Sequence, residues 1–285
     1  MTIWIFMNLF EKFIHSMEGL MERPGNYGWF HLMFVGIVII GTILLCIFGK
    51  NCNKKTFNLI IMIGWIVIFV LEVYKQLVFS FELVGDVPTW DYQWYAFPYQ
   101  LCSTPLYILP FIFLLKEGKV KDATMAYIMT FSLFGGLAVF FYPNDVFVET
   151  IGINIQTMIH HGTQIVLGIF VMVYNRKRLD IKFWLRGIYV FAALVSIALI
   201  LNISVYHIFV AKGINETFNM FYVGPYFDCT LPLLSIVYPK IPYICFILLY
   251  ILGFVLISYI IYIVEKGIYK LASRGTKNEL PKETA

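Results

Sequence analysis

The sequence predicts an all-α protein: a polytopic membrane helical bundle with about seven transmembrane helices and an N-terminal interfacial helix. Hydrophobic residues make up 60% of the 285 residues and charged residues only 13%, and the mean hydropathy is +0.79. Soluble domains are about 45–50% apolar and about 25% charged, so this composition excludes an ordinary soluble domain. Apolar runs of about 20 residues, the length that crosses the hydrocarbon core as a helix, recur along the chain.

The first 20 residues predict a helix that lies in the membrane interface. Apolar residues recur there at helical spacing, with Glu11, Lys12 and His15 between them. The turn at Arg23–Asn26, which contains a Pro-Gly pair, ends this segment. Seven apolar segments follow that we expect to span the membrane, at residues 28–49, 56–81, 98–115, 122–142, 155–174, 183–210 and 241–264.

The distribution of Lys and Arg predicts the orientation of these segments. Sixteen of them lie in the connections on one side and in the C-terminal tail, and four lie on the other side, namely Lys12, Arg23, Lys212 and Lys240. Cytoplasmic loops are enriched in Lys and Arg. We therefore expect a multi-pass protein of the cell membrane with its N-terminus outside and its C-terminus in the cytoplasm.

One seven-helix transmembrane domain at residues 1–265 and a basic cytosolic tail at residues 266–285 account for the chain. No inverted repeat of the kind found in many transporters is apparent. The five cysteines form no CxxC pair and no metal-like spacing, and the histidines show no HxxxH or HxH spacing. The sequence contains no Walker loop and no GxGxxG motif, so we expect no metal and no cofactor. The net charge of +4 is ordinary for a membrane protein and gives no indication of nucleic acid. Membrane lipids are the expected partners.

Two connections on the outer side are long and apolar. Residues 82–97 carry Trp90, Tyr92, Trp94 and Tyr95, an aromatic cluster typical of the headgroup level. Residues 211–240 carry three prolines among apolar residues. We expect this second connection to fold back against the bundle as a lid or a short re-entrant helix.

Cys102 is the candidate nucleophile, about four residues inside the outer end of the third segment. At 1.5 Å per helical residue, it would lie roughly 6 Å below that end. Ser103 and Thr104 add hydroxyl groups beside it, and Pro105 disturbs the helical hydrogen bonds. A membrane cysteine is often only a small apolar residue, and Ser and Thr often bond their own helix. As a nucleophile, the thiol needs a base or a positive charge nearby.

His160 and His161 begin the fifth segment at the depth expected for Cys102. Ionisable residues are costly in the membrane and usually face the bundle interior or a wet cavity. His207, near the outer end of the sixth segment, is a third imidazole on this side, and Asn202 could orient one of the three. Histidine is the natural general base near neutral pH, although a single membrane His often makes only an interhelical hydrogen bond.

Glu72 and Lys75 lie three residues apart in the second segment, hence on one helix face. In one interpretation they form a neutralised pair, with Lys75 extending toward the interface. In the other, Lys75 lines an outer cavity with Tyr74 and Gln76 and holds a phosphate or carboxylate. The sequence leaves both interpretations open.

Six short stretches in a fixed order make the chain resemble a known family. They are Tyr99–Cys102, Phe134–Leu137 with Tyr142–Asn144, His161–Gly162, Asn202, Asn219–Tyr222 and Pro239–Tyr243. Together they resemble the bacterial YwaF-like integral membrane proteins, a family with seven predicted spans. That family is similar to an animal membrane protein family proposed to be cysteine-dependent phospholipid acyltransferases, and more distantly to androgen-induced membrane hydrolases. The resemblance covers about residues 28–265.

The resemblance implies that Cys102 is the nucleophile and that His161 is the conserved imidazole. YwaF-like proteins usually carry His two residues before that Cys, where this chain has Gln100. An amide cannot act as a base, so proton transfer would fall on His161, His160 or His207. The implied reaction is acyl transfer or acyl hydrolysis on a lipid ester in the outer half of the membrane.

In this reaction Gln100, Ser103 or Asn202 would donate to the developing oxyanion, a role in which one donor is typically worth about 10²–10³ in rate. Two other functions remain open. One is a small-solute or ion transporter that uses Glu72, Lys75 and the histidines as a polar pathway. The other is a non-catalytic membrane receptor or assembly subunit that uses the aromatic outer loops.

Overall fold

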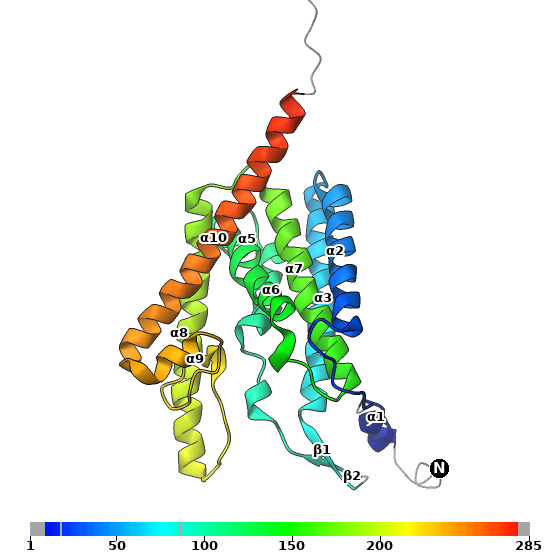
Figure 1. Cartoon of the computed structure of the whole chain (residues 1–285), viewed down its shortest axis with the longest axis vertical. Helices are drawn as coiled ribbons and strands as arrows, with labels where there is room; N and C mark the ends of the chain where they lie inside the picture. The colour runs from blue at the N-terminus through cyan, green and yellow to red at the C-terminus, as the bar shows by residue number, and fades with distance from the viewer. Residues whose placement is uncertain (1–8, 18, 86, 279–285) are drawn as a thin grey trace, which may run out of the picture.

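The structure is a computed structural model that describes residues 9–17, 19–85 and 87–278. The parts of the predicted interfacial helix at residues 1–8 and 18, and the end of the predicted tail at 279–285, lie outside the described residues. The described chain is a bundle of helices whose axes run broadly along its length (Figure 1). Helix α1 (Leu9–Met17) lies at one end of the bundle, and the last turns of α10 (Tyr243–Asn278) project past the other.

Within the described residues, six helices are long and apolar enough to cross a membrane. This confirms a polytopic helical bundle. Six of the seven predicted spans correspond to them: α2 (Trp29–Gly49), α3 (Lys54–Val78), α5 (Lys119–Tyr127) continued by a π-helical turn (Ile128–Ser132) and α6 (Leu133–Phe141), α7 (Ile151–Asn175), α8 (Ile181–Lys212) and α10.

The third predicted span, residues 98–115, differs from the prediction. Its only α-helix is α4 (Pro105–Leu114), preceded by the 3-10 turn η3 (Leu101–Ser103). Ten helical residues rise about 15 Å, half of the roughly 30 Å hydrocarbon core. Pro105 is the physical reason: it has no N–H to donate to the Leu101 carbonyl, which instead accepts from Thr104 N (3.3 Å) and Thr104 Oγ1 (2.7 Å).

The centre of the bundle is formed by α7 and by the α5–α6 pair. Buried residues make up 67% of the apolar window of α7 and 72% of the α5–α6 window, against 17–28% in the other four spans. Helix α7 packs against α2, α3 and α6, and α5 packs against α8. A stack of rings that includes Phe131, Phe191 and Phe254 fills the space between α5–α6, α8 and α10.

The predicted aromatic connection after α3 contains a short hairpin that the sequence did not reveal. Strands β1 (Phe81–Val84) and β2 (Val87–Trp90) pair antiparallel, with Phe81 opposite Trp90. The chain then passes through the 3-10 turn η2 (Trp94–Ala96) and returns along α3 to η3. The hairpin lies beyond the end of α3, on the side of the bundle that carries α1 (Figure 1).

The long connection between α8 and α10 folds back into the bundle, as expected, but as irregular backbone around the 3-10 turn η6 (Met220–Tyr222). Phe218, Met220, Phe221 and Val223 are all buried. A four-residue helix, α9 (Leu234–Val237), and a 3-10 turn, η7 (Tyr238–Lys240), then lead to α10. Irregular backbone at membrane depth is tolerated only where protein or a wet cavity surrounds it, and here protein does so.

The loops predicted to share the basic side do lie together. Asp122 on α5 accepts hydrogen bonds from Arg178 (2.5 Å) in the α7–α8 loop and from Arg186 (2.6 Å) on α8. Glu117 lies 3.0 Å from both Lys54 and Lys121, which joins α3 to α5. We refer to this side of the bundle as the basic end.

Candidate functional site

Cys102 lies on η3, at the break in the third span, rather than on a regular helix. Its carbonyl oxygen lies 2.9 Å from His160 Nε2 and accepts a hydrogen bond from Gln164 Nε2 at 2.8 Å. Both partners come from the centre of α7 and are buried. The 3-10 turn that carries the thiol is therefore held against α7 by two polar side chains.

These contacts fix the tautomers of both imidazoles. A carbonyl oxygen can only accept, so His160 must carry its proton on Nε2, which leaves a lone pair on Nδ1. His161 Nδ1 lies 2.7 Å from the Thr157 carbonyl one turn earlier, so its lone pair is on Nε2. Both lone-pair nitrogens are buried and have no protein partner. The site therefore offers two buried imidazole nitrogens that can accept a proton.

Lys75 and Glu72 form the predicted ion pair, with 2.8 Å between Lys75 Nζ and Glu72 Oε1. The side chain of Lys75 is only 18% exposed, so the pair lies inside the bundle rather than at its surface. The structure thus places a paired ammonium and carboxylate inside the bundle on α3, a helix that packs against both α4 and α7.

A polar chain links this pair to the hairpin side. Gln76 Nε2 donates to Glu72 Oε1 and to the Ala96 carbonyl, both at 2.8 Å, and Tyr92 donates to Gln76 Oε1 at 2.7 Å. Burial, with help from the Glu72 carboxylate, raises the pKa of Tyr92 to about 12. The phenol therefore keeps its proton over the physiological range and remains a donor in this chain.

Gln100 and Asn202, expected as oxyanion donors, hold the folded-back loop instead. Gln100 donates to the Asn219 carbonyl (3.1 Å) and accepts from Phe221 N (2.8 Å). Asn202 donates to the Met220 carbonyl (2.9 Å) and accepts from Met220 N (2.7 Å). Each amide donates through its nitrogen and accepts through its oxygen. The Gln100 side chain therefore holds η6 against η3, and the Asn202 side chain holds η6 against α8.

The two remaining candidates lie in different surroundings. Ser103 is buried and follows Cys102 on η3. His207 on α8 is exposed, and its Nε2 lies 3.1 Å from the Tyr226 hydroxyl, with Tyr206 beside both rings. Ser103 is thus buried in the same turn as Cys102, whereas His207 lies at the surface beside two tyrosine rings.

Sequence reasoning missed Gln164 and the role of Gly135. Gln164 lies four residues after His160, hence on the same face of α7, and this spacing could have revealed it. A Cβ on Gly135 would lie 3.5 Å from Gln164 Oε1 and 3.9 Å from Cys102 Cα, so α6 closes the site with a residue that has no side chain. Gln164 Oε1 is also buried without a protein partner.

Within the described part of the chain, no three His, Cys, Asp or Glu side chains are grouped as metal ligands would be. The candidate side chains supply a thiol, two imidazole lone pairs, an ammonium and a hydroxyl.

No curated protein and no solved structure matches the chain. A family of transmembrane proteins does match, over residues 26–262, which include every span from α2 into α10. This match covers most of the 285 residues. The chain therefore belongs to the TMEM164 family.

Proposed function

We propose that the protein is a lipid-active membrane enzyme in which Cys102 carries out acyl transfer or acyl hydrolysis. The observation that supports this most is the attachment of the Cys102 backbone to His160 and Gln164 at a break in a membrane-depth helix. Backbone that departs from the α-helix at that depth must be surrounded by protein or line a cavity, and here two polar side chains of α7 hold it. A thiol nucleophile requires a base or a positive charge nearby, and His161 and Lys75 are the groups we propose for these roles.

His161 is the best-suited general base. Its Nδ1 bond is made within its own helix, so its free Nε2 can take up a proton without loss of a contact to η3. His160 instead uses Nε2 to hold the Cys102 carbonyl, which makes it a positioning residue. Because Gln100 and Asn202 are bound to the loop, Ser103 and Lys75 are the remaining donors for an oxyanion.

The reaction proceeds in two steps. His161 takes the thiol proton, and the Cys102 sulfur attacks a lipid ester carbonyl; the C–S bond forms, the C–O bond breaks, and the leaving alkoxide receives the proton. A second hydroxyl group, from an acceptor lipid or from water, then attacks the thioester. The C–O bond forms, the C–S bond breaks, and His161 takes the hydroxyl proton and passes it to the leaving sulfur. The acyl group leaves as a new ester or as a carboxylic acid, and the Cys102 thiol is restored.

Membrane lipids are the proposed partners, and the cell membrane, with the N-terminus outside, is the proposed location. The cation distribution of sixteen against four supports this orientation. The site then lies in the outer half of the membrane, where lipid ester carbonyls occur. We also propose that the chain is related to the bacterial YwaF-like proteins. This proposal rests on the motifs that resemble theirs, such as Asn219–Tyr222, which contacts Gln100 near Cys102.

The test uses purified protein in phospholipid vesicles with a fluorescent acyl chain. Cys102→Ala should lower acyl release or transfer by about 10³-fold or more, and His161→Ala by about 10²–10⁴-fold. Cys245→Ala, which alters an exposed cysteine on α10, is the matched control and should retain full activity. Cys102→Ala protein that folds and turns over lipid at the original rate would exclude the thiol mechanism.

A further inference from the structure

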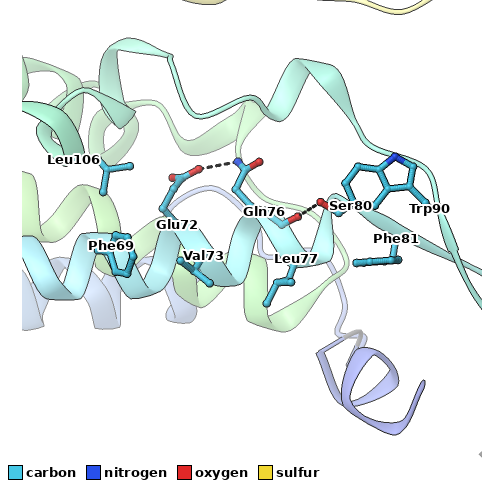
Figure 2. A pocket seen from close by; sticks show the side chains of 9 residues that line it. All are labelled: Phe69, Glu72, Val73, Gln76, Leu77, Ser80, Phe81, Trp90 and Leu106. Atoms are coloured by element: carbon cyan, nitrogen blue, oxygen red, sulfur yellow. Dashed lines mark hydrogen bonds between the residues drawn. The ribbon is translucent and has the colours of Figure 1, made fainter. Parts of the chain in front are cut away.

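Pro110 lies inside α4 and leaves one carbonyl of that helix without its usual donor. This carbonyl belongs to Leu106, one turn earlier, which lines a groove beside α3 together with Phe69 (Figure 2). It accepts a hydrogen bond from Trp65 Nε1 of α3 at 2.9 Å. A side chain from a neighbouring helix thus replaces the missing backbone donor.

Pro105 frees the Leu101 carbonyl in the same way, and a pair of hydroxyl groups reaches it. Thr104 Oγ1 donates to this carbonyl at 2.7 Å and lies 2.6 Å from the hydroxyl of Tyr127 on α5. Thr104 has one hydroxyl proton, and the carbonyl can only accept, so Tyr127 is the donor to Thr104 Oγ1. We refer to this chain of two hydrogen bonds, from Tyr127 through Thr104 to Leu101, as the Tyr127 relay.

The Tyr127 ring has little freedom to turn its hydroxyl away. It stacks on Phe131 of the π-helical turn, with ring centroids 5.6 Å apart and planes at 14°, and Phe131 stacks on Phe191 of α8. The side chains of Tyr127 and Thr104 are both fully buried. A buried hydroxyl depends on its protein partner, so the direction of the Tyr127 relay is fixed by the packing around it.

The relay and α7 hold the two peptide groups on either side of the Cys102 Cα. The Leu101 carbonyl belongs to the peptide group before this atom, and the Tyr127 relay holds it from α5. The Cys102 carbonyl belongs to the peptide group after it, and His160 and Gln164 hold it from α7. Because peptide groups are planar, restraint of both limits φ and ψ of Cys102 and fixes the direction of its Cα–Cβ bond.

We infer that Tyr127 is a positioning residue for Cys102. Through Thr104 and the backbone, its hydroxyl keeps the Cys102 side chain in one orientation, although Tyr127 itself need not touch a substrate. A displacement of about 1 Å at a reacting group can cost about 10² in rate. The effect on lipid turnover rests on the proposed function, whereas the restraint on the thiol does not.

The first test is the rate at which N-ethylmaleimide labels Cys102 in the purified protein, followed for each cysteine by mass spectrometry. Cys102 is only partly exposed, so its labelling depends on local opening of the turn. Tyr127→Phe removes one buried hydrogen bond, and labelling of Cys102 should become about five- to tenfold faster. Tyr250→Phe, which alters another buried ring stacked on Phe254, is the matched control and should leave the rate unchanged. Cys229, buried in another part of the fold, should keep its own rate in both proteins.

The second test is lipid acyl turnover in vesicles. Tyr127→Phe should lower kcat about tenfold and leave KM unchanged, since the phenol holds the thiol and not the lipid. Thr104→Val removes both bonds of the relay and should have a larger effect on labelling and on turnover. Thr104→Ser keeps the hydroxyl and should restore both. Slower turnover together with faster labelling of Cys102 alone is the combination expected from lost positioning.

Three labelling results would overturn the inference: an unchanged rate at Cys102 in the Tyr127→Phe protein, an equal acceleration at Cys229, or a Thr104→Ser protein as altered as Thr104→Val. An unchanged kcat in Tyr127→Phe, when Cys102→Ala is inactive, would also overturn it. Turnover that survives Cys102→Ala would instead reject the thiol mechanism, and the labelling rates would still decide whether Tyr127 restrains Cys102.

Discussion

The carbonyl of Cys102 has two buried donors, and their removal tests how the nucleophile is held. Gln164→Leu alone should lower the free energy of unfolding by about 1 kcal/mol, because His160 still satisfies the carbonyl. His160→Phe with Gln164→Leu should cost about 3 kcal/mol, more than the sum of the single changes, since the buried carbonyl then has no partner. Thermal unfolding of the four proteins in detergent measures this coupling. If the free-energy changes of the two single variants simply add up to that of the double variant, His160 and Gln164 do not act together on the Cys102 carbonyl.

The sequence identified candidate residues by their chemistry but did not predict how each one is used. Cys102 and His160 were both candidates, and the structure places the His160 ring against the Cys102 carbonyl rather than against the thiol. Gln100 was expected at the oxyanion, yet its amide faces a loop more than a hundred residues away in sequence. Which of several amides meets a backbone group depends on the path of that loop, and the local sequence does not contain this information.

Gly135 and Gly136 lie on α6 where it packs near α7, and Gly136 is the one that lies against the α7 backbone. A Cβ on Gly136 would lie 2.7 Å from the His161 carbonyl, part of the α7 backbone. Gly136→Ala should therefore separate the two helices and cost about 1–3 kcal/mol. Gly135→Ala is the control, because its nearest contact would be 3.5 Å, an ordinary van der Waals distance. Equal unfolding temperatures for the two variants would show that α6 shifts freely.

The contact between α3 and α5 at the basic end should weaken in acid. Burial alone would raise the pKa of Glu117, but hydrogen bonds and charges from Lys54 and Lys121 outweigh it and lower the pKa below its usual value of 4.5. A carboxyl group with a lowered folded-state pKa stabilises the protein above pH 4.5, and this contribution is lost as the pH falls through the folded-state pKa. Because Glu117 is half exposed, the contribution should stay below about 1 kcal/mol.

The difference in unfolding temperature between the original protein and Glu117→Gln measures this contribution. The difference should be present at pH 6 and should shrink as the pH is lowered below 4.5. A constant difference over that range would mean that the carboxylate charge is not what joins these helices.

Among the elements, long spans were predictable and short interruptions were not. Hydropathy over about 20 residues identifies a span, because the membrane thickness sets that length. The helical break before Pro105 extends over a few residues only, so the apolar run 98–115 conceals it. The proline itself was visible, but whether a helix kinks or stops there depends on which partners the freed carbonyls find. Here Thr104 supplies them.

Over the whole molecule, charge is strongly divided between the two ends. In the topology predicted from the sequence, the connections and tail of the basic side contain sixteen cations and six acids, a net charge of +10, and the connections of the opposite side contain four cations and ten acids, a net charge of −6. The remaining pair, Glu72 and Lys75, is neutral and lies between them. Together these account for the net charge of +4. Such a division resists transfer of the basic end across a membrane.

This division predicts that the basic end lies in the cytoplasm. The test introduces one cysteine in an exposed loop at each end, Lys177→Cys at the basic end and Glu216→Cys at the other. In intact cells a membrane-impermeant maleimide should label the Glu216→Cys protein above the background of the native cysteines and leave the Lys177→Cys protein at that background. Permeabilised cells should label both, which controls for reactivity. Labelling of only the Lys177→Cys protein in intact cells would show the opposite orientation. The Cys102 site would then lie in the cytoplasmic half of the membrane, and the proposed lipid ester would have to come from the inner leaflet.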